Sequence, residues 1–278
     1  MKKIVIILFL VIFLAGCSKK ENEDNYIKII GYADSISGAN LTKESSELDN
    51  NIYTDKKETK HQIVKTSIGD IEADYVSTLK ILYQYFEIKE YKDSDNNTFR
   101  VNDKGIITHY FWFKNAKDNT KLINESDALN IANEFISKFV DKNDYKISIT
   151  FREDTEKYVI QYVKYIGDLK TSDEATIKID KYGNLYDFES SFFGMIKKDV
   201  SLDFDYQNIE NTITSKLDLA YENIKVDYDN VHYNLNDYTL IMLDEDKYAL
   251  IYTVDVRFEK KLNDSFVTQS DKIIFLVK

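Results

Sequence analysis

The chain has 278 residues, of which 43% are apolar and 31% charged, so it is long and apolar enough to bury a hydrophobic core. The 48 acidic residues outnumber the 37 basic ones for a net charge of -11, which argues against nucleic-acid binding, a function that depends on basic surface. With 8 Gly and no Pro, the composition also excludes collagen-like and proline-rich repeats.

The N-terminus has the pattern of an export signal. Two lysines precede an unbroken apolar run from Ile4 to Leu14, which is shorter than the roughly 20 residues that span a bilayer. Leu14-Ala15-Gly16-Cys17 then resembles a bacterial lipobox, and signals of that type are cleaved before the cysteine, which becomes acylated. The alternative is a plain signal or short anchor with an incidental cysteine. We predict a signal peptide over residues 1–16 and lipidation at Cys17.

Cys17 is the one cysteine of the sequence, so the exported body has no disulfide and must be held together by its core. Because the body is acidic, lipid rather than charge would hold it at an anionic membrane. We expect a lipid-anchored protein on the extracytoplasmic side of the cell membrane, with residues 17–60 as lipid anchor and polar tether. Within that segment, Tyr26 to Tyr32 has strand-forming residues.

Residues 61–118 are predicted to form a mostly β unit. Strand-forming residues from His61 to Ile68 reach the turn signal Gly69-Asp70, and two later strands flank a second turn signal, Asp103-Lys104-Gly105. The stretch from Tyr75 to Phe86 favours neither helix nor strand.

Residues 119–200 are predicted to form one helix followed by three or four antiparallel strands. The helix is indicated by an apolar stripe at helical spacing, with Ser126 as a candidate cap. The stripe consists of Ala128, Ile131, Ala132, Phe135, Ile136 and Phe139. After Asn143 apolar and polar residues alternate, as in half-buried strands, and Gly183 marks the turn into the last strand.

Residues 201–278 are predicted to repeat this order. A second helical stripe consists of Ile209, Ile213, Leu217, Ala220 and Ile224. Alternation from Tyr248 to Phe258 indicates a long half-buried strand, and an echo between residues 99–106 and 177–185 indicates internal repetition. The predicted fold class is therefore α+β, with repeated units of one helix packed on a three- to four-stranded antiparallel sheet, preceded by the mostly β N-terminal unit.

Two segments of the middle unit resemble a known family. Residues 126–135, with the pattern Ala128-Leu129-Asn130-Ile131-Ala132, are similar to the opening helix of PepSY-type domains and its A-x-x-I-A core. Residues 177–185 are similar to the family's closing strand and turn, V-x-V-D-x-x-x-G, whereas residues 205–278 match weakly and lack the glycine turn. The resemblance implies tandem extracytoplasmic modules, as on lipoproteins of Gram-positive spore-formers, that are non-catalytic and sometimes inhibit or modulate peptidases.

No catalytic, cofactor or metal site is indicated by the sequence. The three histidines lie far apart and outside any H-E-x-x-H pattern: His61, His109 and His232. The run from Asp93 to Asn97 begins like a calcium loop, but Thr98 replaces the required Gly and Lys104 the bidentate Glu, so we predict a solvated turn. The sequence contains no phosphate-loop or nucleophile-elbow motif, and no carboxylate pair is singled out.

Aromatic residues make up 14% of the chain and include 21 Tyr. Two aromatic runs are candidates for a partner-binding surface, and they consist of Phe111, Trp112, Phe113, Phe192 and Phe193. The alternative, favoured by their place in predicted strands, is that these rings fill the core side of a sheet.

We therefore expect a membrane-anchored extracytoplasmic lipoprotein that acts as a non-catalytic module for an unidentified envelope protein or peptide, with modulation of a peptidase as one role. Exposed sheet edges would bind a partner strand through main-chain hydrogen bonds. One alternative is a lipoprotein that binds a solute or an envelope polymer, and a less favoured one is a carboxylate-dependent hydrolase. No enzyme activity, cofactor, metal or nucleic-acid partner is predicted.

Overall fold

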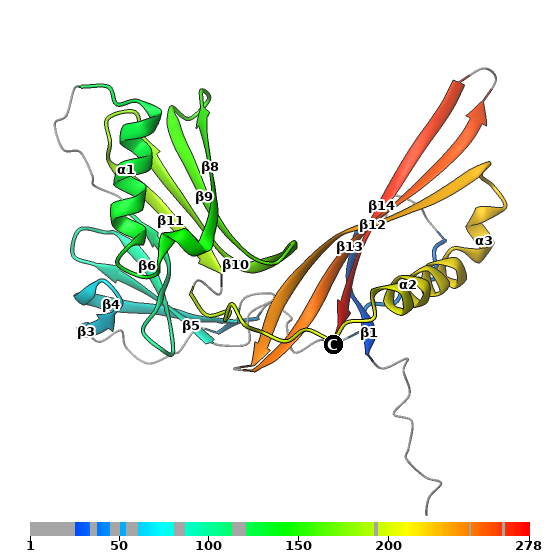
Figure 1. Ribbon diagram of the computed structural model, residues 1–278, viewed down its shortest axis with the longest axis horizontal. Helices are drawn as coiled ribbons and strands as arrows, with labels where there is room; N and C mark the ends of the chain where they lie inside the picture. Colours follow the sequence, from blue (N-terminus) through cyan, green and yellow to red (C-terminus); the bar gives the residue numbers. More distant parts are fainter. Residues whose placement is uncertain are drawn as a thin grey trace, which may run out of the picture.

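The computed structural model of the chain (Figure 1) describes residues 26–33, 38–44, 51–53, 61–80, 87–112, 121–191, 194–244, 246–262 and 265–278. Five sequence predictions concern residues outside these ranges: the signal peptide (1–16), Cys17, Phe113, Phe192 and Phe193. Their roles stay predictions, as do the predicted unit boundaries.

The first part of the described chain consists of strands. They are β1 (Ile27–Ala33), β2 (Asn51–Tyr53), β3 (His61–Thr66), β4 (Gly69–Lys80), β5 (Glu87–Asp93), β6 (Thr98–Asn102) and β7 (Ile107–Phe111). The stretch from Tyr75, which the sequence leaves open between helix and strand, is strand as far as Lys80. β1 lies inside the segment predicted as a tether, at the position of its strand-forming residues.

The middle part opens with the predicted helix, α1 (Glu125–Ile136). Its cap is Asn124 rather than Ser126, because Asn124 Oδ1 accepts from the Asp127 N–H at 2.9 Å and the Asp127 side chain accepts from the Asn124 N–H at 3.4 Å. The elements that follow are the 3₁₀ turn η2 (Lys142–Asp144), β8 (Tyr145–Arg152), β9 (Lys157–Ile166), β10 (Leu169–Asp180) and β11 (Leu185–Ser191).

The last part begins with the second predicted helix, α2 (Tyr206–Ala220), capped by the Asp205 side chain, which accepts from the Asn208 N–H at 3.1 Å. The remaining elements are the short helix α3 (Glu222–Lys225) and the long strands β12 (Asn230–Asp244), β13 (Lys247–Leu262) and β14 (Ser265–Val277).

The described strands join in one mixed sheet. Its main order is β1-β14-β13-β12-β10-β11-β7-β6-β5-β4-β2, with β3 also on β4 and with β9 and β8 continuing from β10. Neighbours are antiparallel except β10 and β12, which pair in parallel through Thr171 and Leu240. Figure 1 shows the sheet splaying at this joint, with β12–β14, α2 and α3 on one side and β3–β11 and α1 on the other.

The predicted fold class of repeated helix-on-sheet units is wrong. The described chain is mostly β, and strands from all three predicted units pair with one another. β7 pairs with β11, β10 with β12, and β1 with β14 almost the whole length of the chain away. The helices could be predicted because an amphipathic stripe is a local pattern in the sequence. The strand that pairs with a given strand edge is set by contacts with residues far along the chain.

Two helix-covered cores flank the joint. Beneath α1, the buried helix residues Ala132, Phe135 and Ile136 share a core with sheet residues that include Ile177 of β10 and Phe188 of β11. Beneath α2, the buried set includes Ile213, Leu217, Tyr252, Phe258 and Phe275. Each predicted stripe faces a core, although the sheet is shared and the α2 core also includes Ile88 of β5.

The similar segments 99–106 and 177–185 each contain a turn, and the two turns have the same geometry. In each turn the side-chain Oδ1 of the first residue, Asn102 or Asp180, accepts from two backbone N–H groups farther along. The glycine three residues on has positive φ, +77° at Gly105 and +87° at Gly183, and donates its N–H to the first residue's carbonyl at 3.0 Å. The repeated sequence pattern therefore reports a repeated turn.

Candidate functional site

The candidate aromatic surface is only partly described. Trp112 stacks on Tyr110 with ring centroids 4.3 Å apart and meets the edge of Phe135 of α1 at 5.7 Å. Phe111 makes an edge contact with Tyr186 at 5.1 Å. Trp112 thus packs against the α1 core, as the core alternative expects, and both side chains are half-buried.

The three histidines stay apart in space and each lies near a carboxylate. The His61 ring lies 3.2 Å from Asp74 Oδ1, and the His232 ring 3.9 Å from Glu259 Oε2. Within the described residues no group of three or more His, Cys, Asp and Glu side chains is arranged to hold a metal ion.

The run from Asp93 to Asn97 is the predicted turn. Asp93 Oδ1 accepts from the N–H groups of Asp95 and Asn97, both at 2.9 Å. Its Oδ2 accepts from Asn97 Nδ2 at 2.9 Å and from the Tyr110 hydroxyl at 3.4 Å. Both carboxylate oxygens therefore serve the turn itself.

A row of charges crosses the sheet face that turns away from α1. Arg100 Nε donates to Glu90 Oε2 at 2.8 Å, and Asp187 accepts from His109 Nε2 at 3.1 Å and from Lys178 Nζ at 2.6 Å. Burial raises the pKa of Asp187, but the hydrogen bonds and charges of His109 and Lys178 outweigh it and leave that pKa below its usual value. The row neutralises itself, which is typical of a structural cross-strand ladder.

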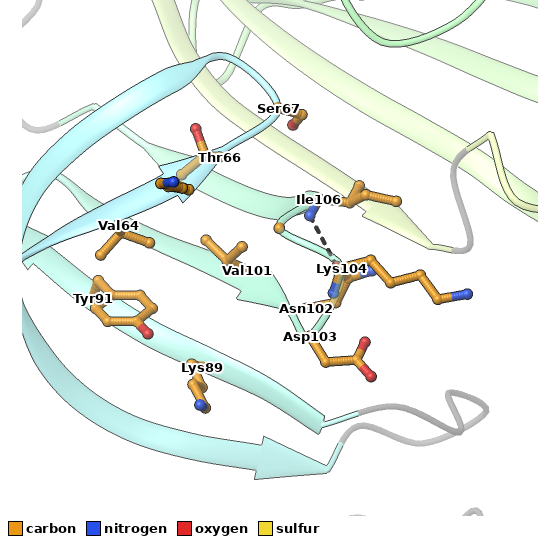
Figure 2. A pocket seen from close by; sticks show the side chains of 12 residues that line it. Val64, Thr66, Ser67, Lys89, Tyr91, Val101, Asn102, Asp103, Lys104 and Ile106 are labelled. Atoms are coloured by element: carbon orange, nitrogen blue, oxygen red, sulfur yellow. Dashed lines mark hydrogen bonds between the residues drawn. The ribbon is translucent and has the colours of Figure 1, made fainter.

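A cavity of about 520 Å³ lies between the β3–β4 turn and the β6–β7 turn (Figure 2). The two turns touch, since the Ser67 N–H donates to the Gly105 carbonyl at 3.0 Å. The buried part of the lining consists of the apolar or aromatic Val64, Tyr91 and Val101 and the polar Asn102. The charged part consists of Lys65, Lys89, Asp103 and Lys104. This lining suits a small polar or anionic molecule, but it offers a single carboxylate and so no acid–base pair.

The outer edge of β8 is a candidate surface for binding another chain. This strand pairs with β9 without a break from Tyr145 opposite Lys164 to Arg152 opposite Lys157, and with no other strand. Among the described residues, 146–152 make no backbone hydrogen bond to any segment but β9. Figure 1 shows β8 with no further strand on its outer side. Its 8 residues span about 26 Å, long enough to template an added strand.

The side chains of β8 divide cleanly between the two faces of the sheet. On the α1 face, Ile147 is 39% exposed and Phe151 43%, with Ile149 half-buried between them. On the other face, Lys146, Ser148, Thr150 and Arg152 are all exposed. An edge with exposed apolar residues and free main-chain groups is rare in a protein that must stay soluble, so it marks a surface that another chain can cover.

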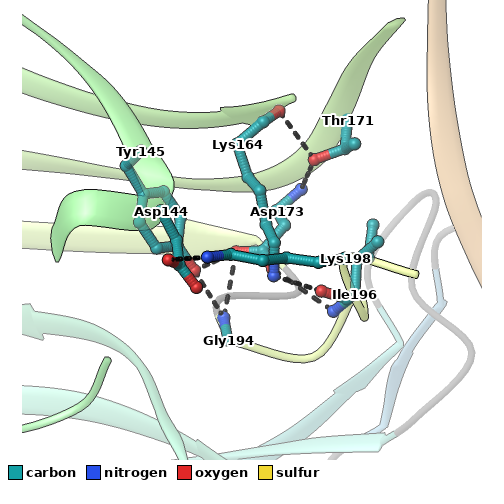
Figure 3. A network of polar contacts seen from close by, with 8 residues as sticks. All are labelled: Asp144, Tyr145, Lys164, Thr171, Asp173, Gly194, Ile196 and Lys198. Atoms are coloured by element: carbon teal, nitrogen blue, oxygen red, sulfur yellow. Dashed lines mark hydrogen bonds and ion pairs between the residues drawn. The ribbon is translucent and has the colours of Figure 1, made fainter. Parts of the chain in front are cut away.

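A buried polar network fixes the beginning of this edge (Figure 3). The Tyr145 hydroxyl, in the first residue of β8, donates to Asp173 Oδ1 at 2.7 Å. The Asp173 carboxylate also accepts from the N–H groups of Gly194 at 2.9 Å and Ile196 at 3.2 Å. Lys164 Nζ lies 3.5 Å from Asp173 Oδ2 and donates to the Ile196 carbonyl. The network thereby ties β8, β9, β10 and the segment that follows β11 together.

Burial decides the protonation behaviour of this network. Asp173 has no exposed surface, and burial raises its pKa even though the hydrogen bonds from Tyr145, Gly194 and Ile196 and the charge of Lys164 oppose the shift. Burial, reinforced by the Asp173 charge, also raises the pKa of Tyr145. Asp173, Lys164 and Tyr145 are buried and bond to one another and to nearby backbone, so the network holds these segments together.

Sequence reasoning missed both the β8 edge and the network. The alternation of Ile147, Ile149 and Phe151 correctly predicts a strand, but periodicity says nothing about which strand ends a sheet. One signal for the network was present, since Asp173 stands on the same alternation as Ala175 and Ile177, where a buried apolar residue is expected. The pairing of β9 and β10 is irregular between Lys170 and Glu174, at the place where Asp173 turns inward.

Comparisons with known proteins identify no family. No protein-family model matches the chain, and no curated protein matches it. The crystal structure of an uncharacterized protein from Eubacterium rectale ATCC 33656 is similar over 69% of this chain and 71% of that chain, with 11% identity and a TM-score of 0.33. A TM-score this low carries no argument about fold or function. Within the described residues, none of the helices combines the length and the apolarity needed to cross a membrane.

Proposed function

We propose that the protein is an extracytoplasmic lipoprotein, tethered to the cell membrane through acylated Cys17, that binds an extended segment of an envelope protein or peptide along β8. The single observation that carries the proposal is the unbroken, uncovered β8 edge with exposed Ile147 and Phe151. Binding there adds a strand to the sheet through main-chain hydrogen bonds, while the alternating side chains select the partner.

Two features support a binding role over a catalytic one. The buried Lys164–Asp173 network and the Asp187 charge row each satisfy their own members, so their polar groups serve the fold. The network also fixes the start of β8, which lowers the conformational entropy lost when a partner strand pairs with the edge. The resemblance of residues 126–135 and 177–185 to PepSY-type domains is part of this proposal and suggests a peptidase as the regulated partner.

Strand addition is tested by selecting ligands from a displayed library of random linear peptides and measuring hydrogen exchange of the full chain. We expect the selected peptides to slow exchange of the β8 backbone amides and to leave β1 unchanged. The Tyr145 N–H turns away from β9 to the Lys142 carbonyl, so strand alternation places the Ile149 N–H on the free edge as well. An Ile149→Pro variant, which removes this donor, should therefore bind more weakly than Ile149→Ala, which keeps it. Selected peptides that leave β8 exchange unaltered would contradict the proposal, and this readout does not depend on whether the Pro variant folds.

Membrane attachment is tested separately through Cys17. Labelled palmitate should be incorporated into the wild-type protein in cells and not into Cys17→Ala, and the variant should leave the membrane fraction on washing. Equally firm membrane binding of Cys17→Ala would overturn the lipid anchor while leaving the strand-binding role open to its own test.

The cavity between the β3–β4 and β6–β7 turns favours a second candidate, a lipoprotein that binds a solute or an envelope polymer. Its volume of about 520 Å³ lies within the range of about 300–1,000 Å³ typical of small-molecule sites. Thermal unfolding with a panel of sugars and phosphate esters tests this role. A ligand-induced rise in Tm that is lost in Lys89→Ala and kept in Lys92→Ala, on the opposite face of β5, would favour it.

A further inference from the structure

The β8–β9 pair has an unusual charge balance for this protein. The chain as a whole carries a net charge of -11. In contrast, neither Tyr145–Arg152 nor Lys157–Ile166 contains an acidic residue, and each contains two basic ones. The positive charge of β8 belongs to Lys146 and Arg152, one near each end of the uncovered edge.

Both cations lie on one face and lack a carboxylate partner. Strand alternation places Lys146 and Arg152 with Ser148 and Thr150 on the face away from α1. No described carboxylate lies within ion-pair distance of either side chain, and Lys146 Nζ instead sits 3.8 Å from the centre of the Tyr165 ring. Lysines on β10, on the far side of β9 from β8, do find partners, as Lys170 with Glu174 and Lys178 with Asp187 show.

The turn after β8 limits where a partner's charges can lie. Glu153 and Asp154 follow Arg152 directly, and Glu156 is paired with Lys181 at 2.8 Å. Positive potential therefore extends along β8 as far as Arg152 and reverses beyond it. A bound segment is favoured in the register that keeps its own acidic residues beside β8 and away from the turn.

We infer that the occupant of the β8 edge is an extended segment with acidic and apolar residues in alternation. The inference rests on the proposed strand-binding function and names the chemistry of its partner. Apolar side chains of the segment lie beside Ile147 and Phe151 on the α1 face, and its carboxylates lie beside Lys146 and Arg152 on the other face. This arrangement covers the exposed apolar area and gives both free cations a partner in the same step.

A second copy of this chain is a poorer occupant. In an antiparallel pairing of two β8 strands centred on Ile149, Lys146 of each copy lies opposite Arg152 of the other, which gives two pairs of like charges. Like charges directly opposite each other destabilise a strand pair. The charges that would recruit an acidic partner therefore also oppose self-association along this edge.

The test uses three synthetic peptides that differ only in charge, in which Val alternates with Glu, Thr or Lys. Binding to the full chain is measured by calorimetry at low and high salt. We expect the Glu peptide to bind about tenfold more tightly than the Lys peptide at low salt, with the Thr peptide between them and the difference shrinking as salt rises. A Glu peptide N-methylated on alternate residues, which cannot donate along one edge, should not bind.

Charge-reversed variants identify the cations responsible. Lys146→Glu combined with Arg152→Glu should invert the preference so that the Lys peptide binds more tightly. Lys260→Glu combined with Lys261→Glu, an equal charge change at exposed positions of β13, should leave the preference as in the wild type. The salt titration of the wild-type chain carries the same information if the first variant fails to fold.

The outcomes separate this inference from the function beneath it. Equal binding of the Glu, Thr and Lys peptides would overturn the acidic partner and leave strand addition standing. Undiminished binding of the N-methylated peptide, or no binding of any peptide, would overturn strand addition itself. Dimerisation of the chain in the absence of peptide, abolished by the charge-reversed variant, would show that a second copy is the occupant and would also overturn the inference.

Discussion

Replacing Asp173 with Ala should cost more stability than almost any other single change in the described chain. The substitution removes the acceptor for the buried Tyr145 hydroxyl and for the N–H groups of Gly194 and buried Ile196, and it leaves the buried Lys164 without its carboxylate. Breaking a buried ion pair by removing one partner costs about 3–5 kcal/mol. We expect the free energy of unfolding to fall by about 4 kcal/mol. That is a large part of the total free energy of unfolding of a typical protein, which is about 5–15 kcal/mol.

The matched substitution Lys164→Met should cost much less. It removes the ammonium but keeps the carboxylate of Asp173 with its three hydrogen bonds, so every donor keeps its acceptor and only the Ile196 carbonyl loses a donor. Losing that one carbonyl contact costs about 1–2 kcal/mol. A further control is Lys197→Ala, which breaks an exposed pair with Asp246 and should leave stability close to that of the wild type.

Urea unfolding of the full chain, followed by tryptophan fluorescence, measures these differences. Trp112 is the one tryptophan of the sequence, and it packs on Tyr110 and Phe135 in the α1 core, on the same side of the joint as the network. An Asp173→Ala variant within about 1 kcal/mol of the wild type, or a Lys164→Met variant costlier than Asp173→Ala, would refute the assignment of the carboxylate as the centre of the network.

Two other predictions concern a turn and a charge row. Gly183→Ala should lower the free energy of unfolding by about 2 kcal/mol, since φ is +87° and the new Cβ would lie 3.2 Å from Ile131 Cδ1 of α1. The control Gly167→Ala, at φ +60° with open space around it, should cost about 1 kcal/mol. Equal losses in urea unfolding would show that the contact with α1 is unimportant. Asp187→Asn should cost about 1 kcal/mol near neutral pH. Because the folded-state pKa of Asp187 is lowered, its stabilisation is present above about pH 4 and is lost as the pH falls through that folded value. The gap between wild type and variant should therefore close in acid, and a gap that stays constant down to pH 2 would contradict the ion-pair assignment.

The elements that the sequence predicted well are those with a local cause. The apolar stripe from Ala128 becomes α1 and the stripe from Ile209 becomes α2, because a helix satisfies its own backbone and needs only one apolar face. The glycine turn at Gly183 and the alternation of β13 are local in the same sense. Even for α1 the predicted N-cap, Ser126, is wrong, because the observed N-cap is Asn124, which forms reciprocal hydrogen bonds with Asp127.

Local sequence patterns could not predict the candidate site on the β8 edge. Ile147 and Phe151 look like ordinary inward residues of a strand, and they are exposed only because β8 ends its part of the sheet. Lys146 and Arg152 look like ordinary surface cations, and they stand out only because no carboxylate among the described residues forms an ion pair with them. Asp173 was the exception, since its place in an apolar alternation carried a readable signal.

The sequence alone therefore determined the two long helices, several of the strands and the glycine turns, together with the acidic composition, the single cysteine and the N-terminal pattern around it. Only the tertiary structure decided that β7 joins β11, that β10 joins β12, and that one edge of β8 pairs with no strand of the described chain. The physical reason is that helix formation satisfies backbone hydrogen bonds within a few residues. A strand satisfies its own only through a partner that can lie anywhere in the chain, and the order of those partners decides which edge remains to bind something else.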